Sequence, residues 1–228
     1  MPRPYPHVRG HVIKAVLILA MVGTARAESP TPSDGSRLYR PCVVCHQPNA
    51  WGSPDGAIPG LAGQQERYLQ RQLAVFRSGA RVDTAMQIVT AHPSAGSEDD
   101  IVALARYLAA LEPNPNPVNG SGKHLRVGQE LYTHICAECH GVAGQGEAGN
   151  RVPRIAGQNY PYLTRQIEAA AALHKGLAPP EMTSALRSMR PAEKEALADY
   201  ISRLGNSEPL LDSSGPEGAG KYPPPHPP

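Results

Sequence analysis

All the cysteines of this chain lie in two five-residue motifs of identical spacing. They read Cys42-Val-Val-Cys45-His46 and Cys136-Ala-Glu-Cys139-His140. Two thiols three positions apart at the end of a helix can form thioethers with the two vinyl groups of one haem, and the following histidine can then ligate the iron. We therefore predict two covalently bound haem c groups, with all four cysteines as attachment points and His46 and His140 as the proximal iron ligands.

Other uses of paired cysteines fit the pattern less well. A thioredoxin-type redox pair needs no following histidine and is expected in a βαβ context. A four-cysteine zinc site usually places its pairs about 15–20 residues apart, whereas 90 residues separate Cys45 from Cys136. Disulfides suit an exported protein, but two cysteines spaced in this way inside a helix have poor geometry for one.

Methionine is the usual sixth iron ligand in cytochromes c. Met86 lies 40 residues after His46, and Met182 lies 42 residues after His140. Each methionine falls in a segment that we expect to be a loop, between the second helix and the last helix of its half of the chain. We predict that Met86 and Met182 are the two sixth ligands.

Further residues near the motifs have less certain roles. His92 and His174 are alternative sixth ligands. Met189 has no counterpart in the first half of the chain and is expected to pack in a core. Pro59 and Pro153 each follow their histidine by 13 residues, so a carbonyl there could accept a hydrogen bond from the proximal imidazole, unless the proline merely turns the loop.

The chain is an internal duplication. The cysteine motifs recur at an offset of 94 residues, and so do eight residues of the segment 59–72 in the segment 153–166. The flanking patterns Gly35-x-x-Leu-Tyr and Ala105-x-Tyr recur at an offset of 93. Self-similarity of this kind indicates two copies of one structural unit.

Composition divides the chain into five segments. Residues 1–27 combine Arg3, Arg9 and Lys14 with an apolar run, Ala15 to Gly23, and an Ala-x-Ala site at Ala27, which predicts a signal peptide cleaved near Ala27; the apolar run is too short to span a bilayer. Residues 28–112 and 123–206 are the two predicted domains, joined by a Pro/Gly linker, 113–122, that favours extended backbone. The Pro-rich tail, 207–228, is expected to be disordered.

Charge excludes one class of partner. Without residues 1–27 the chain holds 18 basic and 20 acidic side chains, and its two halves carry about −2 and +2. No dense basic stripe of the kind that nucleic acids require is present. No later segment is long and apolar enough to span a bilayer, so we expect at most peripheral association with a membrane.

The periodicity of apolar residues predicts helices throughout, and the fold class is all-α. Segments 35–45, 64–78, 127–139 and 159–173 read as helices. Ser97 begins a further helix with Ile101, Leu104, Ala105 and Leu108 on one face, and Pro191 begins its counterpart, whose buried face would be Leu197, Ile201 and Leu204. Four tyrosines are expected to pack where the first and last helices of each half cross: Tyr39, Tyr107, Tyr132 and Tyr200.

These motifs together resemble the dihaem cytochrome c4 family, over roughly residues 33–206. The shared features are the signal peptide, two CxxCH motifs, a P-x-[LI]-A-G-Q segment, a Y-L-x-R-Q-[LI] helix, a ligand methionine and a last helix ending in A-x-Y. The resemblance implies two tandem class I cytochrome c domains that face each other about a pseudo-twofold axis, with His/Met ligation and electron carriage in the periplasm. The segment 87–96 is longer than the family's usual stretch after the first ligand methionine.

The expected function is electron transfer without catalysis, so we do not expect an enzyme. The chain would carry single electrons from a quinol-oxidising complex or a dehydrogenase to a terminal oxidase or reductase. An alternative is the haem c electron-accepting subunit of a dehydrogenase for sulfide, thiosulfate, sulfite or alcohol, since such subunits use the same haem domain. A dihaem peroxidase would need an open sixth position on iron, and two ligand methionines argue against that.

Overall fold

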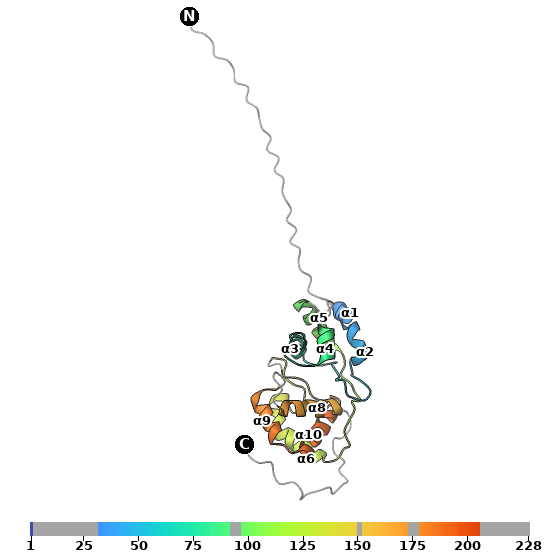
Figure 1. Cartoon of the computed structure of the whole chain (residues 1–228), viewed down its shortest axis with the longest axis vertical. Coiled ribbons are helices and arrows are strands. Elements are labelled where there is room, and N and C mark those ends of the chain that lie inside the picture. The colour runs from blue at the N-terminus through green and yellow to red at the C-terminus, as the bar shows by residue number, and fades with distance from the viewer. Residues whose placement is uncertain (2–31, 92–96, 150–151, 173–177, 206–228) are drawn as a thin grey trace.

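The protein forms two bundles of helices that follow each other along the chain (Figure 1). The computed structural model describes residues 1, 32–91, 97–149, 152–172 and 178–205. The first bundle contains α1 (Pro32–Tyr39), α2 (Val43–His46), α3 (Glu66–Arg77), α4 (Thr84–Thr90) and α5 (Glu98–Ala110). The second contains α6 (Leu125–Leu131), α7 (Ala137–His140), α8 (Tyr160–Ala171), α9 (Pro180–Ser188) and α10 (Pro191–Arg203).

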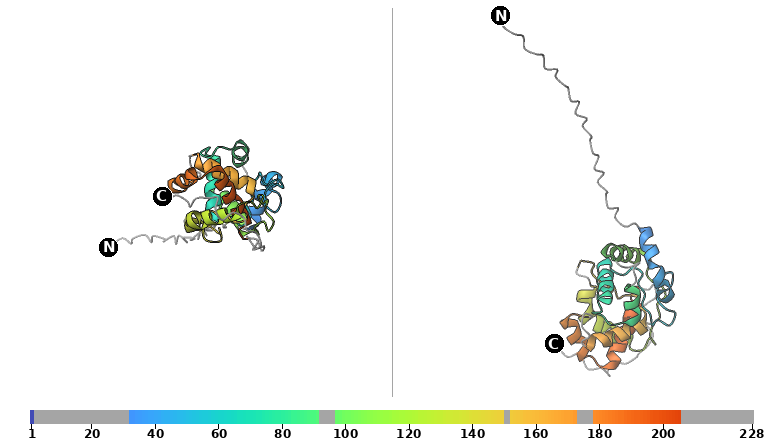
Figure 2. Two further views of the ribbon diagram at one scale, coloured as in Figure 1. Left: turned by 90° about the horizontal axis from the view of Figure 1, so that it is seen from below. Right: turned by 45° about the horizontal axis from the view of Figure 1, so that its top comes forward.

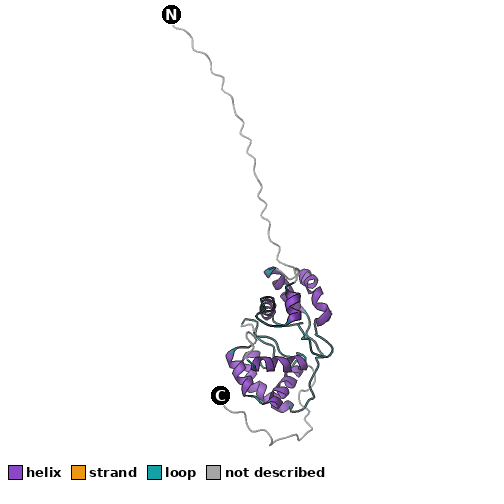
Figure 3. Cartoon of the chain, in the orientation of Figure 1, coloured by secondary structure: helices purple, strands orange, loops and turns teal. Residues whose placement is uncertain are grey.

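The two bundles adjoin each other in each of the turned views (Figure 2). The described residues are helices and loops without a strand, as the colouring by secondary structure shows (Figure 3). Their only β-type pairing is an isolated bridge between Glu147 and Val152. The all-α class and the duplication predicted from the sequence are confirmed.

Each bundle is built on the crossing of its first and last helices. α1 packs against α5, and α6 packs against α10. Gly35 of α1 lies against the backbone carbonyl of Ala103, and a Cβ built on Gly35 would lie 2.5 Å from that oxygen. Gly128 of α6 meets the carbonyl of Ala196 in the same way. Glycine is required at both crossings because no side chain fits between the two backbones.

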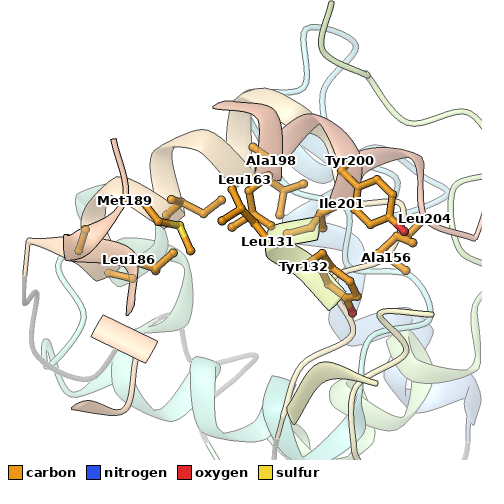
Figure 4. Close-up of a cluster of buried hydrophobic side chains, with 14 residues drawn as sticks. Leu131, Tyr132, Ala156, Leu163, Leu186, Met189, Ala198, Tyr200, Ile201 and Leu204 are labelled. Atoms are coloured by element: carbon orange, nitrogen blue, oxygen red, sulfur yellow. The ribbon is translucent and has the colours of Figure 1, made fainter. Parts of the chain in front are cut away.

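The four tyrosines pack at these crossings, as predicted. The rings of Tyr39 and Tyr107 have centroids 5.8 Å apart, and those of Tyr132 and Tyr200 are 5.6 Å apart. Figure 4 shows Tyr132 and Tyr200 in the buried cluster of the second bundle. Both separations are in the range that favours tilted aromatic pairs.

The starts of the two last helices agree with the sequence signals. Ser97 caps α5, and its hydroxyl accepts a hydrogen bond from the Asp100 N–H at 3.0 Å. Pro191 is the first residue of α10. The apolar faces predicted for these helices are buried, and their members are Ile101, Leu104, Ala105 and Leu108 in α5, and Leu197, Ile201 and Leu204 in and just after α10.

The prediction that Met86 and Met182 lie in loops is wrong. Met86 lies in α4, which begins because the Asp83 carboxylate accepts a hydrogen bond from the Met86 N–H at 3.0 Å. Met182 lies in α9, which starts at Pro180, a residue preset for the first turn. Helices this short carry too little periodic signal to be recognised in a sequence, and packing against α3 and α8 supports them.

Some of the sequence predictions concern residues outside the described part of the chain. These are the signal peptide (1–27), the alternative ligands His92 and His174, and the tail (207–228). The linker 113–122 is described, and it contains no helix. Among the described residues, no helix has the length and hydropathy needed to cross a membrane.

Candidate haem sites

Both motif histidines are buried and hydrogen-bonded in the same way. His46 ends α2 and His140 ends α7, and they are 5% and 8% exposed. The His46 Nδ1 lies 3.0 Å from the Pro59 carbonyl oxygen, and the His140 Nδ1 lies 3.1 Å from that of Pro153. A carbonyl can only accept, so Nδ1 carries the proton in both rings and the Nε2 lone pair is available for a metal.

Burial also sets the protonation state of the two histidines. It lowers the pKa of His46 and of His140 below the ordinary value, although the hydrogen bond to the proline carbonyl acts in the opposite direction. The imidazoles are therefore neutral at neutral pH, which is the form that ligates iron.

The cysteines of each motif differ in exposure. Cys42 and Cys136 are partly buried, whereas Cys45 and Cys139 are exposed, and none of the four forms a disulfide. Burial, with a smaller contribution from the neighbouring motif cysteine, raises the pKa of the Cys42 thiol to about 11 and that of Cys136 to about 12. Redox-active thiols instead have a lowered pKa, so these pairs do not resemble a thioredoxin-type site. The two pairs lie in different bundles, which is incompatible with one four-cysteine zinc site.

In the first bundle, Cys42 and Met86 face one apolar hollow. The hollow is lined by Leu38, Pro41, Cys42, Leu73, Met86, Val89, Thr90 and Leu104. The Thr90 hydroxyl donates to the Met86 carbonyl at 2.7 Å, so its hydrogen-bonding capacity is used within α4. The site thus offers a thiol, a thioether sulfur and hydrocarbon, which suits the flat apolar body of a porphyrin.

The second bundle places the corresponding residues against its main core. Cys136, Ala137 and Met182 are partly buried and pack on the buried cluster that contains Met189. Met189 is only 7% exposed, in keeping with its predicted packing role, and Figure 4 shows it beside Leu186. Met182, by contrast, keeps part of its side chain accessible in α9.

The two bundles exchange a reciprocal pair of glutamine contacts. Gln158 binds the backbone of Gly60, with Gly60 N–H to Gln158 Oε1 at 3.0 Å and Gln158 Nε2 to Gly60 O at 2.9 Å. Gln64 binds the backbone of Arg154 in the same two-point manner, with both distances 2.8 Å. Gln64 and Gly60 are the repeat counterparts of Gln158 and Arg154, so the contacts are related by a pseudo-twofold axis.

A second contact between the bundles is centred on one arginine. The Arg81 guanidinium donates to Gln72 Oε1 of the first bundle at 2.5 Å and to Gln166 Oε1 of the second at 2.8 Å. It also donates to the Tyr162 hydroxyl at 3.2 Å. Gln72 and Gln166 are repeat counterparts, so a single cation bridges an equivalent pair.

No role was predicted from the sequence for Gln64, Gln158 or Arg81. Gln64 and Gln158 belong to the recurring A-G-Q segment, and that recurrence was a usable signal for a shared function. Arg81 carries no such signal, because the residue 94 positions later is Lys175.

Two helical bundles, each with a buried histidine directly after a Cys-x-x-Cys pair, define a dihaem c-type cytochrome. The chain belongs to the cytochrome c family, whose model matches residues 32–112 and again residues 125–205. It is thus a tandem pair of cytochrome c domains, and its cofactors are two covalently bound haem c groups.

Relatives and solved structures agree with this tandem arrangement. The chain is 31% identical, over 85% of its length and 94% of the relative's, to the thiosulfate dehydrogenase electron acceptor of Stutzerimonas stutzeri (strain A1501). It is 29% identical to cytochrome c4 of Pseudomonas aeruginosa, over 68% of its own length and 78% of that protein's. The crystal structure of reduced cytochrome c4 from Pseudomonas stutzeri shares the fold, with a TM-score of 0.66 and 21% identity over 76% of this chain and 98% of that one.

These findings make the chain a cytochrome c4-like electron-transfer protein, not an enzyme. Electron carriage between redox partners follows from the family, while the particular partners are not specified by it.

Proposed function

We propose that the four motif cysteines attach one haem to each domain, and that His46 with Met86 and His140 with Met182 ligate the two irons. The bound haem supplies one-electron chemistry between Fe(III) and Fe(II). The observation that carries the proposal is the geometry of the first site. There a buried neutral histidine leaves Nε2 open, and Cys42 and Met86 line one apolar hollow.

The proposed carrier is exported and acts in the periplasm. Cleavage near Ala27 leaves domains at residues 28–112 and 123–206, joined by the linker 113–122. Export is supported by the basic start of the chain, the apolar run from Ala15 to Gly23 and the Ala-x-Ala site at Ala27. The carrier takes single electrons from a quinol-oxidising complex or a dehydrogenase and passes them to a terminal oxidase or reductase.

Each domain has a surface at which electrons can enter or leave. Cys45 and Cys139 are exposed, so the cofactor edge attached to each would reach the surface. Val44, between the two cysteines of the first motif, is 84% exposed, and Ile135, directly before the first cysteine of the second motif, is 38% exposed. Apolar side chains around an exposed edge suit brief contact with a redox partner, because they can be desolvated at little cost.

A second candidate is the electron-accepting subunit of a thiosulfate dehydrogenase. It is supported by the relative of that name, which matches the chain over nearly its whole length. To separate the two functions, the reduction rate of the purified holoprotein by a thiosulfate dehydrogenase is compared with its reduction by a quinol-oxidising complex. Faster reduction by the dehydrogenase, and a stable complex with it, favours the subunit; the reverse favours the free carrier.

The ligand assignment is tested with Met86→Ala and Met182→Ala in the holoprotein. Each variant should lose the ferric Met charge-transfer band of one haem and keep that of the other, because only one iron loses its thioether sulfur. Met189→Leu is the matched control, since it replaces a buried methionine at similar volume, and it should keep both bands. An unchanged spectrum in either alanine variant removes that methionine from the ligand set.

A further inference from the structure

The carbonyl that accepts the hydrogen bond of each motif histidine belongs to a peptide group that is also hydrogen-bonded to the other domain. The Pro59 C=O and the Gly60 N–H are the two ends of one peptide group. The first accepts from His46 Nδ1 at 3.0 Å, and the second donates to Gln158 Oε1 at 3.0 Å. An unbroken chain of two hydrogen bonds therefore leads from the histidine of one domain to a side chain of the other.

The second domain repeats this chain with the roles exchanged. The Pro153 C=O accepts from His140 Nδ1 at 3.1 Å, and the Arg154 N–H of the same peptide group donates to Gln64 Oε1 at 2.8 Å. Each histidine is thus connected to a glutamine of the opposite domain.

The orientation of both carboxamides follows from their partners. The Gln158 oxygen accepts two N–H groups, those of Gly60 and Asn159, and its nitrogen donates to the Gly60 carbonyl. The Gln64 oxygen likewise accepts from Arg154 and Gln65, and its nitrogen donates to the Arg154 carbonyl. A flipped amide would lose every one of these bonds. Each carboxamide oxygen therefore points at the peptide group whose carbonyl accepts the hydrogen bond of the histidine.

We propose that Gln64 and Gln158 are positioning residues that lower the reduction potential of the haem in the opposite domain. Donation from the Gly60 N–H to Gln158 polarises the peptide group and makes the Pro59 oxygen a stronger acceptor. A stronger bond to Nδ1–H raises the basicity of the imidazole, and a more basic ligand favours Fe(III). The proposal rests on the proposed function, in which His46 and His140 are iron ligands.

The test compares Gln158→Met and Gln64→Met in the haem-loaded, full-length protein. Site-resolved potentials are obtained by following the paramagnetically shifted NMR signals of each haem during a redox titration, with each haem assigned through contacts to its own domain. Gln158→Met should raise the potential of the haem on His46 and leave the other unchanged. Gln64→Met should do the reverse and raise only the reduction potential of the haem on His140.

Gln65→Met is the matched control for loosening of the interface. Gln65 Nε2 donates across the interface to the Gln145 carbonyl at 2.8 Å. The N–H of that peptide group donates to the backbone carbonyl of His140, so the group has no hydrogen bond to a histidine ring. This variant should leave both potentials unchanged. Three outcomes would overturn the proposal. They are a change in the reduction potential of the haem in the mutated domain, an equal change in the potentials of both haems, and the same change of potential in Gln65→Met.

A second readout does not depend on the potential. In the reduced protein labelled with ¹⁵N-histidine, the Nδ1–H proton of His46 should move upfield in Gln158→Met, because its hydrogen bond weakens. Gln158→Asn replaces the methionine variant if that variant accumulates poorly. Its side chain is one methylene too short to reach Gly60, so it should give the same upfield shift. An unmoved proton in both variants contradicts the inference.

Failure of this inference is distinguishable from failure of the proposed function. If Met86→Ala and Met182→Ala each remove one charge-transfer band while the glutamine variants change neither potential, the ligands stand and only the role of the glutamines falls. If the wild-type protein lacks two His/Met haems, both fall together.

Discussion

The first and second domains differ in the segment that leads into the cysteine motif. In the first, Pro41 lies in a 3₁₀ turn, Arg40–Cys42, between Tyr39 and the first cysteine. In the second, one more residue intervenes, and Tyr132–Cys136 forms a π-helical turn. A π turn holds one residue more than an α turn, so it absorbs the insertion without moving the histidine at the end of the motif.

The wider turn preserves the contact around the histidine. The Tyr39 hydroxyl donates to the Gln47 carbonyl at 2.7 Å, and the Tyr132 hydroxyl donates to the Gly141 carbonyl at 2.5 Å. Both acceptors are the residue directly after the motif histidine. The number of residues changed between the repeats while the site geometry did not, which indicates that the geometry is what function requires.

The largest expected effect comes from removing one attachment site. The double variant Cys42→Ala/Cys45→Ala should lose the covalent haem of the first domain and keep that of the second, because each motif serves one cofactor. The matched variant Cys136→Ala/Cys139→Ala should give the mirror-image result. Alkaline pyridine spectroscopy measures the haem content per chain in both variants. Loss of both haems from either variant would show that the two domains do not bind haem independently.

Substitution of the glycines at the two helix crossings should have nearly as large an effect, in this case on stability. Gly35→Ala and Gly128→Ala each push a methyl group into the backbone of the facing helix, and overpacking of this kind costs about 3 kcal/mol where a backbone must move. Each substitution should lower the thermal unfolding temperature of its own domain. Gly149→Ala is the matched control, because a Cβ built on Gly149 has no atom within 4 Å, and it should leave the unfolding temperature unchanged. A Gly35 or Gly128 variant that unfolds at the wild-type temperature would mean that the crossing tolerates a side chain.

The residue after each histidine gives a smaller, asymmetric effect. Gln47 and Gly141 both have positive φ, 68° and 78°, with ψ of 161° and 155°. Glycine alone adopts this region readily, and it costs another residue about 1–3 kcal/mol. Gly141→Gln should therefore destabilise the second domain by at least about 1 kcal/mol, because a Cβ there also displaces the Gln145 side chain. Gln47→Gly should stabilise the first domain by less than that, since glycine gains entropy when unfolded. Urea unfolding measures both, and destabilisation by Gln47→Gly would contradict the assignment of strain.

The smallest effect is expected from the tyrosine hydroxyls. Tyr39→Phe and Tyr132→Phe each remove one hydrogen bond to a loop carbonyl and should cost about 1 kcal/mol. The two losses should be similar despite the different turns before the cysteines. A much larger loss in the second domain would show that the π turn depends on Tyr132 in a way that the first domain does not share.

The sequence predicted the features that depend on local chemistry or on recurrence. The CxxCH motifs, the capped start of α5, Pro191 at the start of α10, the tyrosine pairs and the bond from His46 to Pro59 all follow from spacing or periodicity. The helical state of the segments around Met86 and Met182 did not, because short helices owe their stability to tertiary packing. The contacts of Gln64 and Gln158 also escaped prediction, since they form only when the two domains meet and no single repeat encodes its partner's position.

The central claim is that the duplicated sites each hold one covalent, His/Met-ligated haem. The most direct measurement is the intact mass of the mature protein, produced in a host competent in cytochrome maturation, together with its ferric absorption spectrum. We expect the mass of the processed chain plus two haems, and a Met charge-transfer band from each. A colourless protein, or one that carries fewer than two haems per chain, would contradict the account.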